Sequence, residues 1–164
     1  IEPNNILIVT NKLQKPTVAK QLPQIPAQNI IVEPIGRNTA PCIGLAGLFV
    51  RRMDPEGVMV VLPGDHIMQD EKEFRRILNL AIWVAYESGK LITVGIHPTR
   101  PETGYGYIQV IDEDDGANPY FSRGVFKVKT FAEKPNLATA QQFLTSGDFL
   151  WNSGMFIWRV DAIL

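Results

Sequence analysis

The sequence predicts an α/β fold: a mainly parallel, Rossmann-like sheet flanked by helices, with a strand-rich second part. Short apolar runs and helical patterns alternate through the first half of the chain. One of these runs, 58–62, contains no polar residue, which is typical of a strand buried on both faces of a parallel sheet. In the second half, strand patterns follow one another with fewer helices between them. Together these observations favour a parallel α/β sheet with added strands.

The 164 residues are expected to form a single domain, 1–164. The net charge of −1 shows no basic excess that would indicate nucleic acid, and no charged tail indicates a membrane surface. No apolar run approaches the roughly 18 residues of a membrane span. The single cysteine, Cys42, excludes an internal disulfide framework and predicts a cytoplasmic protein.

In the first half, each element follows from an apolar run or a capping pattern. Thr39 is expected to be the N-cap of a helix that carries Pro41 in its first turn. Asp70 and Glu73 have the spacing of a capping box, and Gly89 is placed to end that helix. The predicted elements are strands at 6–9, 30–32, 58–62 and 91–96, and helices at about 16–22, 39–53 and 71–88.

The second half begins with a predicted strand at 107–111, followed by an exposed loop rich in Asp and Gly at 112–119. A strand at 126–133 with one polar face, a short helix at 137–145 and a last strand at 155–158 complete the pattern. The sequence contains no internal repeat.

The first candidate site lies at the end of the strand at 58–62, where Pro63 and Gly64 stop the apolar run and Asp65 follows. Ligands bind at the carboxyl ends of strands in open α/β sheets. A carboxylate there can hold a divalent cation against the phosphates of a nucleotide. Asp65 could equally cap the next turn.

A second candidate cluster, 33–39, combines the acceptor Glu33 with Arg37, Asn38 and Thr39 at a helix start. A purine edge needs such a mixture of acceptors and donors, and a helix N-terminus favours phosphate. A carboxylate suits the N1–H and N2–H₂ donors of guanine, which adenine does not offer. A loop with a capping motif would explain the same residues.

Further polar residues follow the later strands. Gly106 belongs to a segment in which glycines would let the main chain approach a ligand. Glu133 could accept bonds from sugar hydroxyls while Lys134 binds a phosphate, although an exposed charge pair is the simpler explanation. Asn152 and Ser153 would add neutral sugar contacts.

Five motifs, taken in order, resemble those of the sugar-nucleotide pyrophosphorylases, and most closely the bacterial mannose-1-phosphate guanylyltransferases. Position 64 is commonly alanine in that family, so Gly64 is a mild departure. The five motifs are Glu-Pro-Ile-Gly-Arg-Asn-Thr-Ala-Pro at 33–41, Val-Leu-Pro-Gly-Asp-His at 61–66, Pro-Thr-Arg-Pro-Glu-Thr-Gly-Tyr-Gly-Tyr-Ile at 98–108, Phe-Ala-Glu-Lys-Pro at 131–135 and Trp-Asn-Ser-Gly-Met-Phe at 151–156.

The resemblance implies a nucleotide-diphospho-sugar transferase fold and the conversion of GTP and mannose 1-phosphate into GDP-mannose and pyrophosphate. It implies that Asp65 binds Mg²⁺ and is catalytic, and that Lys134 is catalytic near the sugar phosphate. The residues expected to bind nucleotide are Glu33, Arg37, Asn38, Thr39 and Gly64, and those expected to bind mannose are Gly106, Glu133, Asn152 and Ser153.

The resemblance further implies that the family's first strand with its Gly-rich triphosphate loop has no counterpart in the chain, and that the second metal-binding aspartate is missing as well. We therefore expect the central part of a catalytic domain that is inactive by itself, from a parent that could be a homo-oligomer. The alternatives are a sister enzyme with another base or sugar, and a non-catalytic subunit that binds sugar nucleotides.

Overall fold

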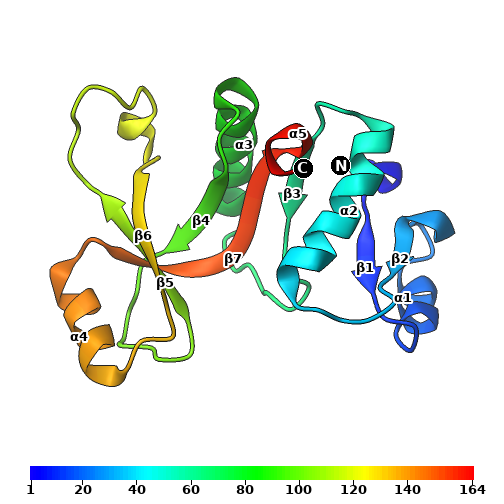
Figure 1. Cartoon of the computed structure of the whole chain (residues 1–164), viewed down its shortest axis with the longest axis horizontal. Coiled ribbons are helices and arrows are strands. Elements are labelled where there is room, and N and C mark those ends of the chain that lie inside the picture. Colours follow the sequence, from blue (N-terminus) through cyan, green and yellow to red (C-terminus); the bar gives the residue numbers. More distant parts are fainter. The chain divides into compact units, whose positions relative to one another are not determined.

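The computed structural model describes residues 1–164 and divides the chain into two compact units (Figure 1). The first comprises Ile1–Met59 and Arg159–Leu164, and the second comprises Val60–Trp158. The boundary therefore falls within strand β3 (Val58–Val61) and at the end of strand β7 (Phe149–Arg159). Helices and strands occur in both units, which confirms the α/β class.

The first unit contains a small parallel sheet. Its strands β1 and β2 pair in the register Ile8↔Ile30, and the buried side chains of Ile30 and Ile31 contribute to the core. The buried Asn29 donates from Nδ2 to the carbonyl oxygens of Asn4 (2.8 Å) and Ile6 (3.0 Å), so its amide is satisfied within the protein. The elements of this unit are β1 (Ile8–Thr10), α1 (Lys15–Gln21), β2 (Ile30–Val32), α2 (Thr39–Met53) and α5 (Val160–Ile163).

Helix α2 covers the expected residues, but its N-cap is Asn38 and not Thr39. Asn38 has φ 67° and ψ −168°. Asparagine adopts positive φ more readily than a β-branched residue does, so the change in chain direction falls on Asn38 and Thr39 becomes the first helical residue. No side-chain bond caps the helix.

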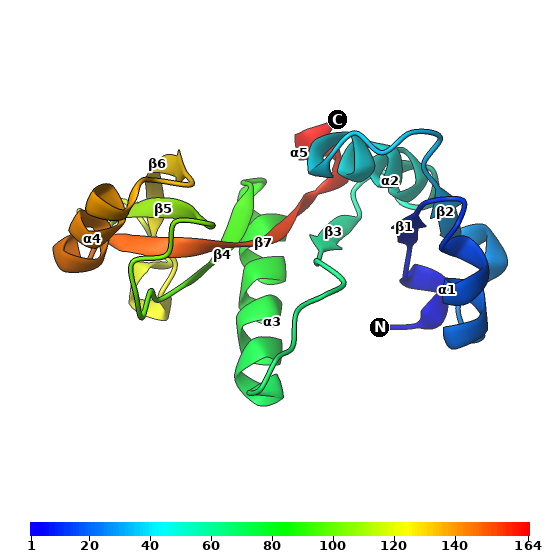
Figure 2. The ribbon, with the colours of Figure 1, turned by 90° about the horizontal axis from the view of Figure 1, so that it is seen from below.

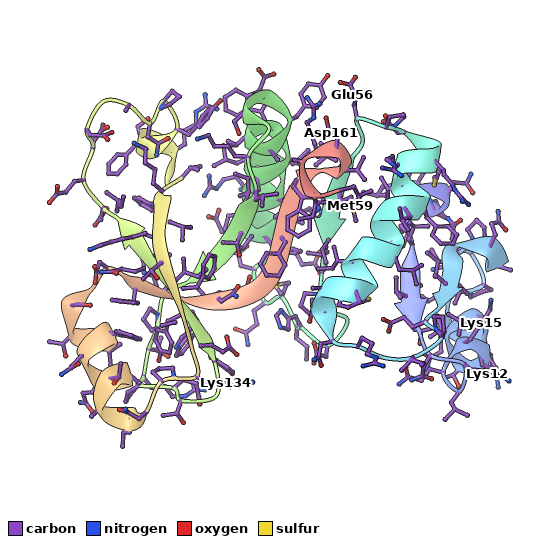
Figure 3. The ribbon with its side chains drawn as sticks, in the orientation of Figure 1. Lys12, Lys15, Glu56, Met59, Lys134 and Asp161 are labelled. Carbon is purple, nitrogen blue, oxygen red and sulfur yellow. The ribbon has the colours of Figure 1, made fainter.

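Arg159, the last residue of β7, forms ion pairs within the first unit. Its guanidinium binds Glu56 (Nη2 to Oε1, 3.3 Å) and Asp161 (Nε to Oδ1, 3.0 Å), and Figure 3 shows these two acidic side chains near each other. Leu164 lies against Gly47 of α2, where an added Cβ would be 3.5 Å from its methyl carbons. The glycine thus permits α5 to pack closely on α2.

The second unit is built on an antiparallel sheet. Strand β7 pairs with β4 and β5, and β5 pairs with β6, all antiparallel. The sheet has the order β3-β7-β5-β6, with β4 also on β7. These pairs form the strand-rich part that the sequence predicts, and the parallel pairing lies between β1 and β2. The remaining elements are α3 (Glu71–Ser88), β4 (Ile92–Ile96), β5 (Gly106–Ile111), β6 (Lys127–Glu133) and α4 (Leu137–Ser146).

Both helices of this unit begin at a side-chain cap. Asp70 accepts a bond from the Glu73 N–H at 2.9 Å, and Asn136 accepts one from the Thr139 N–H at 2.9 Å. Helix α3 ends at Gly89 in the left-handed conformation (φ 64°), as predicted. Figures 1 and 2 show α3 beside β4 and α4 near the start of β7.

Two strand predictions were wrong. Strand β3 is not buried on both faces, since only Met59 is buried; β3 is at the end of its sheet and has a single neighbouring strand there. Strand β7 begins at Phe149, six residues earlier than the predicted start at Met155. Pairing with β4 and β5 on both sides keeps Asn152 and Ser153 in the strand despite their low strand propensity.

Candidate functional site

Three of the predicted sugar-binding residues converge on one face of the sheet in the second unit. Gly106 is the first residue of β5 and is the register partner of Glu133, the last residue of β6. Asn152 comes from the middle of β7, the other neighbour of β5. The sequence motifs are therefore brought together from three strands by antiparallel pairing.

The Glu133 carboxylate and the Asn152 side chain can approach the main chain of β5 because position 106 has no side chain. A Cβ built on Gly106 would lie 2.8 Å from Glu133 Oε2, 3.5 Å from Asn152 Cβ and 3.8 Å from Asn152 Nδ2. A real side chain does not fit at 2.8 Å without displacing the carboxylate. The glycine thus lets a carboxylate oxygen and an amide nitrogen come close to the same point of the strand, and these two groups bind hydroxyls as acceptor and donor.

Asn152 and Ser153 differ in what they can offer to a ligand. The Asn152 Oδ1 accepts a bond from the Gly154 N–H (3.1 Å), which leaves Nδ2 free to donate. Ser153 is buried, and its hydroxyl donates to the Val94 carbonyl (2.6 Å) and accepts from the Met155 N–H (3.2 Å). Its hydroxyl thus joins β7 to β4, and its assignment to sugar binding remains a prediction.

Lys134 follows β6 directly and lies at the end of that strand (Figure 3). Its Nζ is 3.5 Å from Glu133 Oε1, with both side chains about two-thirds exposed. Its main chain adopts φ 46°, in the left-handed region, and its N–H donates to the Tyr105 carbonyl at 3.2 Å. Backbone conformations of this kind occur often at functional sites. Sequence patterns carry no signal for this geometry.

The turn before β5 contains contacts that the sequence motifs did not reveal. The Arg100 guanidinium lies 5.3 Å from the centre of the Trp151 ring, and the Tyr105 ring meets Trp151 edge-on at 5.3 Å. Glu102 accepts bonds from Gly104 N–H (3.0 Å) and from Arg100 (3.1 and 3.2 Å). The Gly104 N–H, followed by Arg100, lowers the pKa of Glu102, so this carboxylate is ionised at neutral pH.

Asp65 lies in an exposed turn after β3. Its carboxylate makes no hydrogen bond, so it does not cap the turn, and Asp70 is the cap of the next helix. Gly64 beside it has no atom within 4 Å of where a Cβ would stand. No group of three or more potential metal ligands is present. A free single carboxylate fits Mg²⁺, which typically takes one or two carboxylates together with substrate phosphates.

In the first unit, the candidate nucleotide-binding residues surround the start of α2. The Glu33 N–H donates to the Thr10 carbonyl (2.9 Å), which fixes the residue at the end of β2 while its carboxylate has no partner. Burial, and secondarily the charge of Glu33, raises the pKa of the Cys42 thiol. Arg37 and Asn38 are exposed. The uncapped helix start leaves main-chain N–H donors free, as an anion site requires.

The chain matches a known protein family over nearly its whole length. The model of the nucleotidyl transferase family matches residues 2–163. The chain belongs to this family. No helix of the structure has the length and apolar character needed to cross a membrane.

Among its relatives, the mannose-1-phosphate guanylyltransferase of Escherichia coli K12 is 44% identical over 168 residues, which cover 100% of this chain and 34% of that protein. The xanthan biosynthesis protein XanB of Xanthomonas campestris is 44% identical over 96% of the chain and 32% of its own length. The resemblance inferred from the five motifs is thus confirmed. The chain spans about a third of the length of these relatives.

A solved structure shows the same fold. The mannose-1-phosphate geranyltransferase of Thermus thermophilus superposes with a TM-score of 0.79 at 31% identity, covering 98% of this chain and 44% of that one. The mannose-6-phosphate isomerase of Helicobacter pylori gives a TM-score of 0.77 at 30% identity, covering 95% of this chain and 56% of that one.

Proposed function

We propose that the full-length protein containing this chain is a mannose-1-phosphate guanylyltransferase, which forms GDP-mannose and pyrophosphate from GTP and mannose 1-phosphate. The observation that carries the proposal is the approach of Glu133 Oε2 and Asn152 Nδ2 to the main chain of Gly106, which has no side chain. This acceptor and this donor suit adjacent sugar hydroxyls. The relatives named mannose-1-phosphate guanylyltransferase indicate the sugar and the base.

The chemistry requires alignment more than proton transfer. The phosphate of the sugar is already an anionic nucleophile, and one of its oxygens forms a bond to the α-phosphorus of GTP as the bond to pyrophosphate breaks. Glu133 and Asn152 would hold the sugar hydroxyls. The Lys134 ammonium, two-thirds exposed, would bind the sugar phosphate and stabilise the charge that develops during transfer.

On the nucleotide side, we propose that Glu33 and Asn38 bind the guanine, with Arg37 and Thr39 beside them and Gly64 near the ribose. Glu33 supports this because its carboxylate is free of protein partners. Asp65 would hold Mg²⁺, again because its carboxylate is free. When bound, Mg²⁺ supplies positive charge to the phosphates during the transfer.

The test is steady-state kinetics of the full-length protein with pyrophosphate release as the signal. We expect turnover with GTP and mannose 1-phosphate, dependence on Mg²⁺, and little activity with UTP or dTTP and glucose 1-phosphate. A preference for the second pair would identify a sister pyrophosphorylase. Binding of GDP-mannose without turnover would identify a non-catalytic subunit.

We also propose a cytoplasmic location, supported by the single free cysteine. Subcellular fractionation would test it, with the protein expected in the fraction that contains cytoplasmic enzymes.

A further inference from the structure

The main chain of Lys134 is fixed by a segment outside its own strand. Its φ of 46° is rare for a residue with a side chain, and such a conformation persists only where the surrounding structure holds it. The Lys134 N–H donates to the carbonyl of Tyr105 (3.2 Å). The turn that precedes β5 therefore contributes to the position of the Lys134 main chain, together with the pairing of Glu133 with Gly106.

The main chain of that turn is hydrogen-bonded to the core through the phenol group of Tyr107. Tyr107 has no exposed surface, and its ring packs with Phe143 of α4 at 5.2 Å. Its hydroxyl donates to the carbonyl of Glu102 (2.8 Å) and accepts from the N–H of the same residue (3.0 Å). Both main-chain polar groups of Glu102 thus bind the hydroxyl of a fully buried residue, and the Glu102 N–H also donates to the Arg100 carbonyl (3.0 Å).

The side chain of Glu102 extends this attachment to the rest of the turn. One carboxylate oxygen accepts from the Gly104 N–H and the other from Arg100. Arg100 and Tyr105 both contact the ring of Trp151, which is 8% exposed. Contacts therefore lead without interruption from the core to the turn, and from the Tyr105 carbonyl to Lys134.

We propose that Tyr107 is a positioning residue for Lys134. The phenol fixes the main chain of Glu102, Glu102 fixes the turn, and the Tyr105 carbonyl fixes the Lys134 N–H. The effect is indirect, since the enclosed hydroxyl of Tyr107 cannot touch a substrate. Its catalytic consequence rests on the function proposed above, whereas the attachment itself can be measured independently of that function.

The first measurement is hydrogen exchange, followed by mass spectrometry of the full-length protein. Tyr107→Phe removes one oxygen and keeps the ring in the core. We expect exchange of the Lys134 N–H to become about tenfold faster or more, while the Val110 N–H, which donates to the Asp148 carbonyl, keeps its rate. Tyr120→Phe is the matched control, because the Tyr120 hydroxyl makes no hydrogen bond. Unchanged exchange at Lys134 in Tyr107→Phe would overturn the proposal.

The second measurement is a double-mutant cycle in the enzyme assay. Tyr107→Phe should lower kcat about five- to twentyfold with little change in KM for GTP. In a Lys134→Met background, it should change kcat less than about twofold, because the residue it positions is already gone. An equal loss in both backgrounds would overturn the proposal. If the unaltered protein does not make GDP-mannose, the proposed function fails, and the exchange measurement alone decides the role of Tyr107.

Discussion

Gly106→Ala tests whether the Glu133 carboxylate and the Asn152 amide beside Gly106 bind the sugar. The new Cβ would lie 2.8 Å from Glu133 Oε2, closer than real side-chain carbons approach an oxygen. The Glu133 side chain is 71% exposed, so the carboxylate can swing into solvent without disturbing the core. We therefore expect the free energy of unfolding to change by less than about 1 kcal/mol.

The effect on activity should be much larger. A hydrogen bond to a charged group contributes about 1.5–3 kcal/mol. Losing the one proposed between Glu133 and the sugar would therefore lower kcat/KM for mannose 1-phosphate about tenfold to a hundredfold. Pyrophosphate release at varied sugar concentration gives this value, with KM for GTP and thermal unfolding measured alongside.

Gly44→Ala is the matched control, since no atom lies within 4 Å of the Cβ it adds. It should leave the kinetics unchanged. A Gly106→Ala protein with full kcat/KM for mannose 1-phosphate would refute the assignment of these residues to the sugar.

Other substitutions separate the remaining roles. Asp65→Asn should remove most turnover while thermal unfolding stays unchanged, because the amide keeps the shape and loses the charge proposed to hold Mg²⁺; unchanged turnover and Mg²⁺ dependence would contradict this. Glu133→Gln should lower kcat/KM for the sugar about tenfold to a hundredfold with GTP affinity unaltered, and weaker GTP binding instead would place Glu133 on the nucleotide side. Gly95→Ala should destabilise the fold by about 1–3 kcal/mol in denaturant unfolding, because its Cβ would meet Leu150 at 2.5 Å; an unchanged midpoint would show that the strands adjust freely. Hydrogen bonds in the turn hold the pKa of Glu102 below its usual 4.5. The ionised carboxylate therefore stabilises the turn fully above pH 4.5, and this stabilisation is lost as the pH falls through the lowered pKa. Hydrogen exchange of the turn, corrected for intrinsic rates, should accelerate only below pH 4.5.

The parts of the architecture that the sequence predicted correctly are those that depend on residues close together in the chain. Asp70 and Gly89 bound helix α3 as expected, because capping by a carboxylate and a left-handed glycine are decided within a few residues. The N-cap of α2 is Asn38 and not the predicted Thr39. Both residue types cap helices, but this position has a positive φ, which asparagine adopts more readily than threonine.

The sequence by itself determined the α/β class, the family through its five motifs, and the residue types of the candidate site. Tertiary structure alone placed Gly106, Glu133 and Asn152 together, because antiparallel pairing joins strands that are far apart in the chain. Tertiary structure also decided that the Ser153 hydroxyl donates to the Val94 carbonyl of the neighbouring strand and that the Tyr107 hydroxyl donates to the Glu102 carbonyl. Such contacts depend on register and packing, which no local pattern of residues specifies.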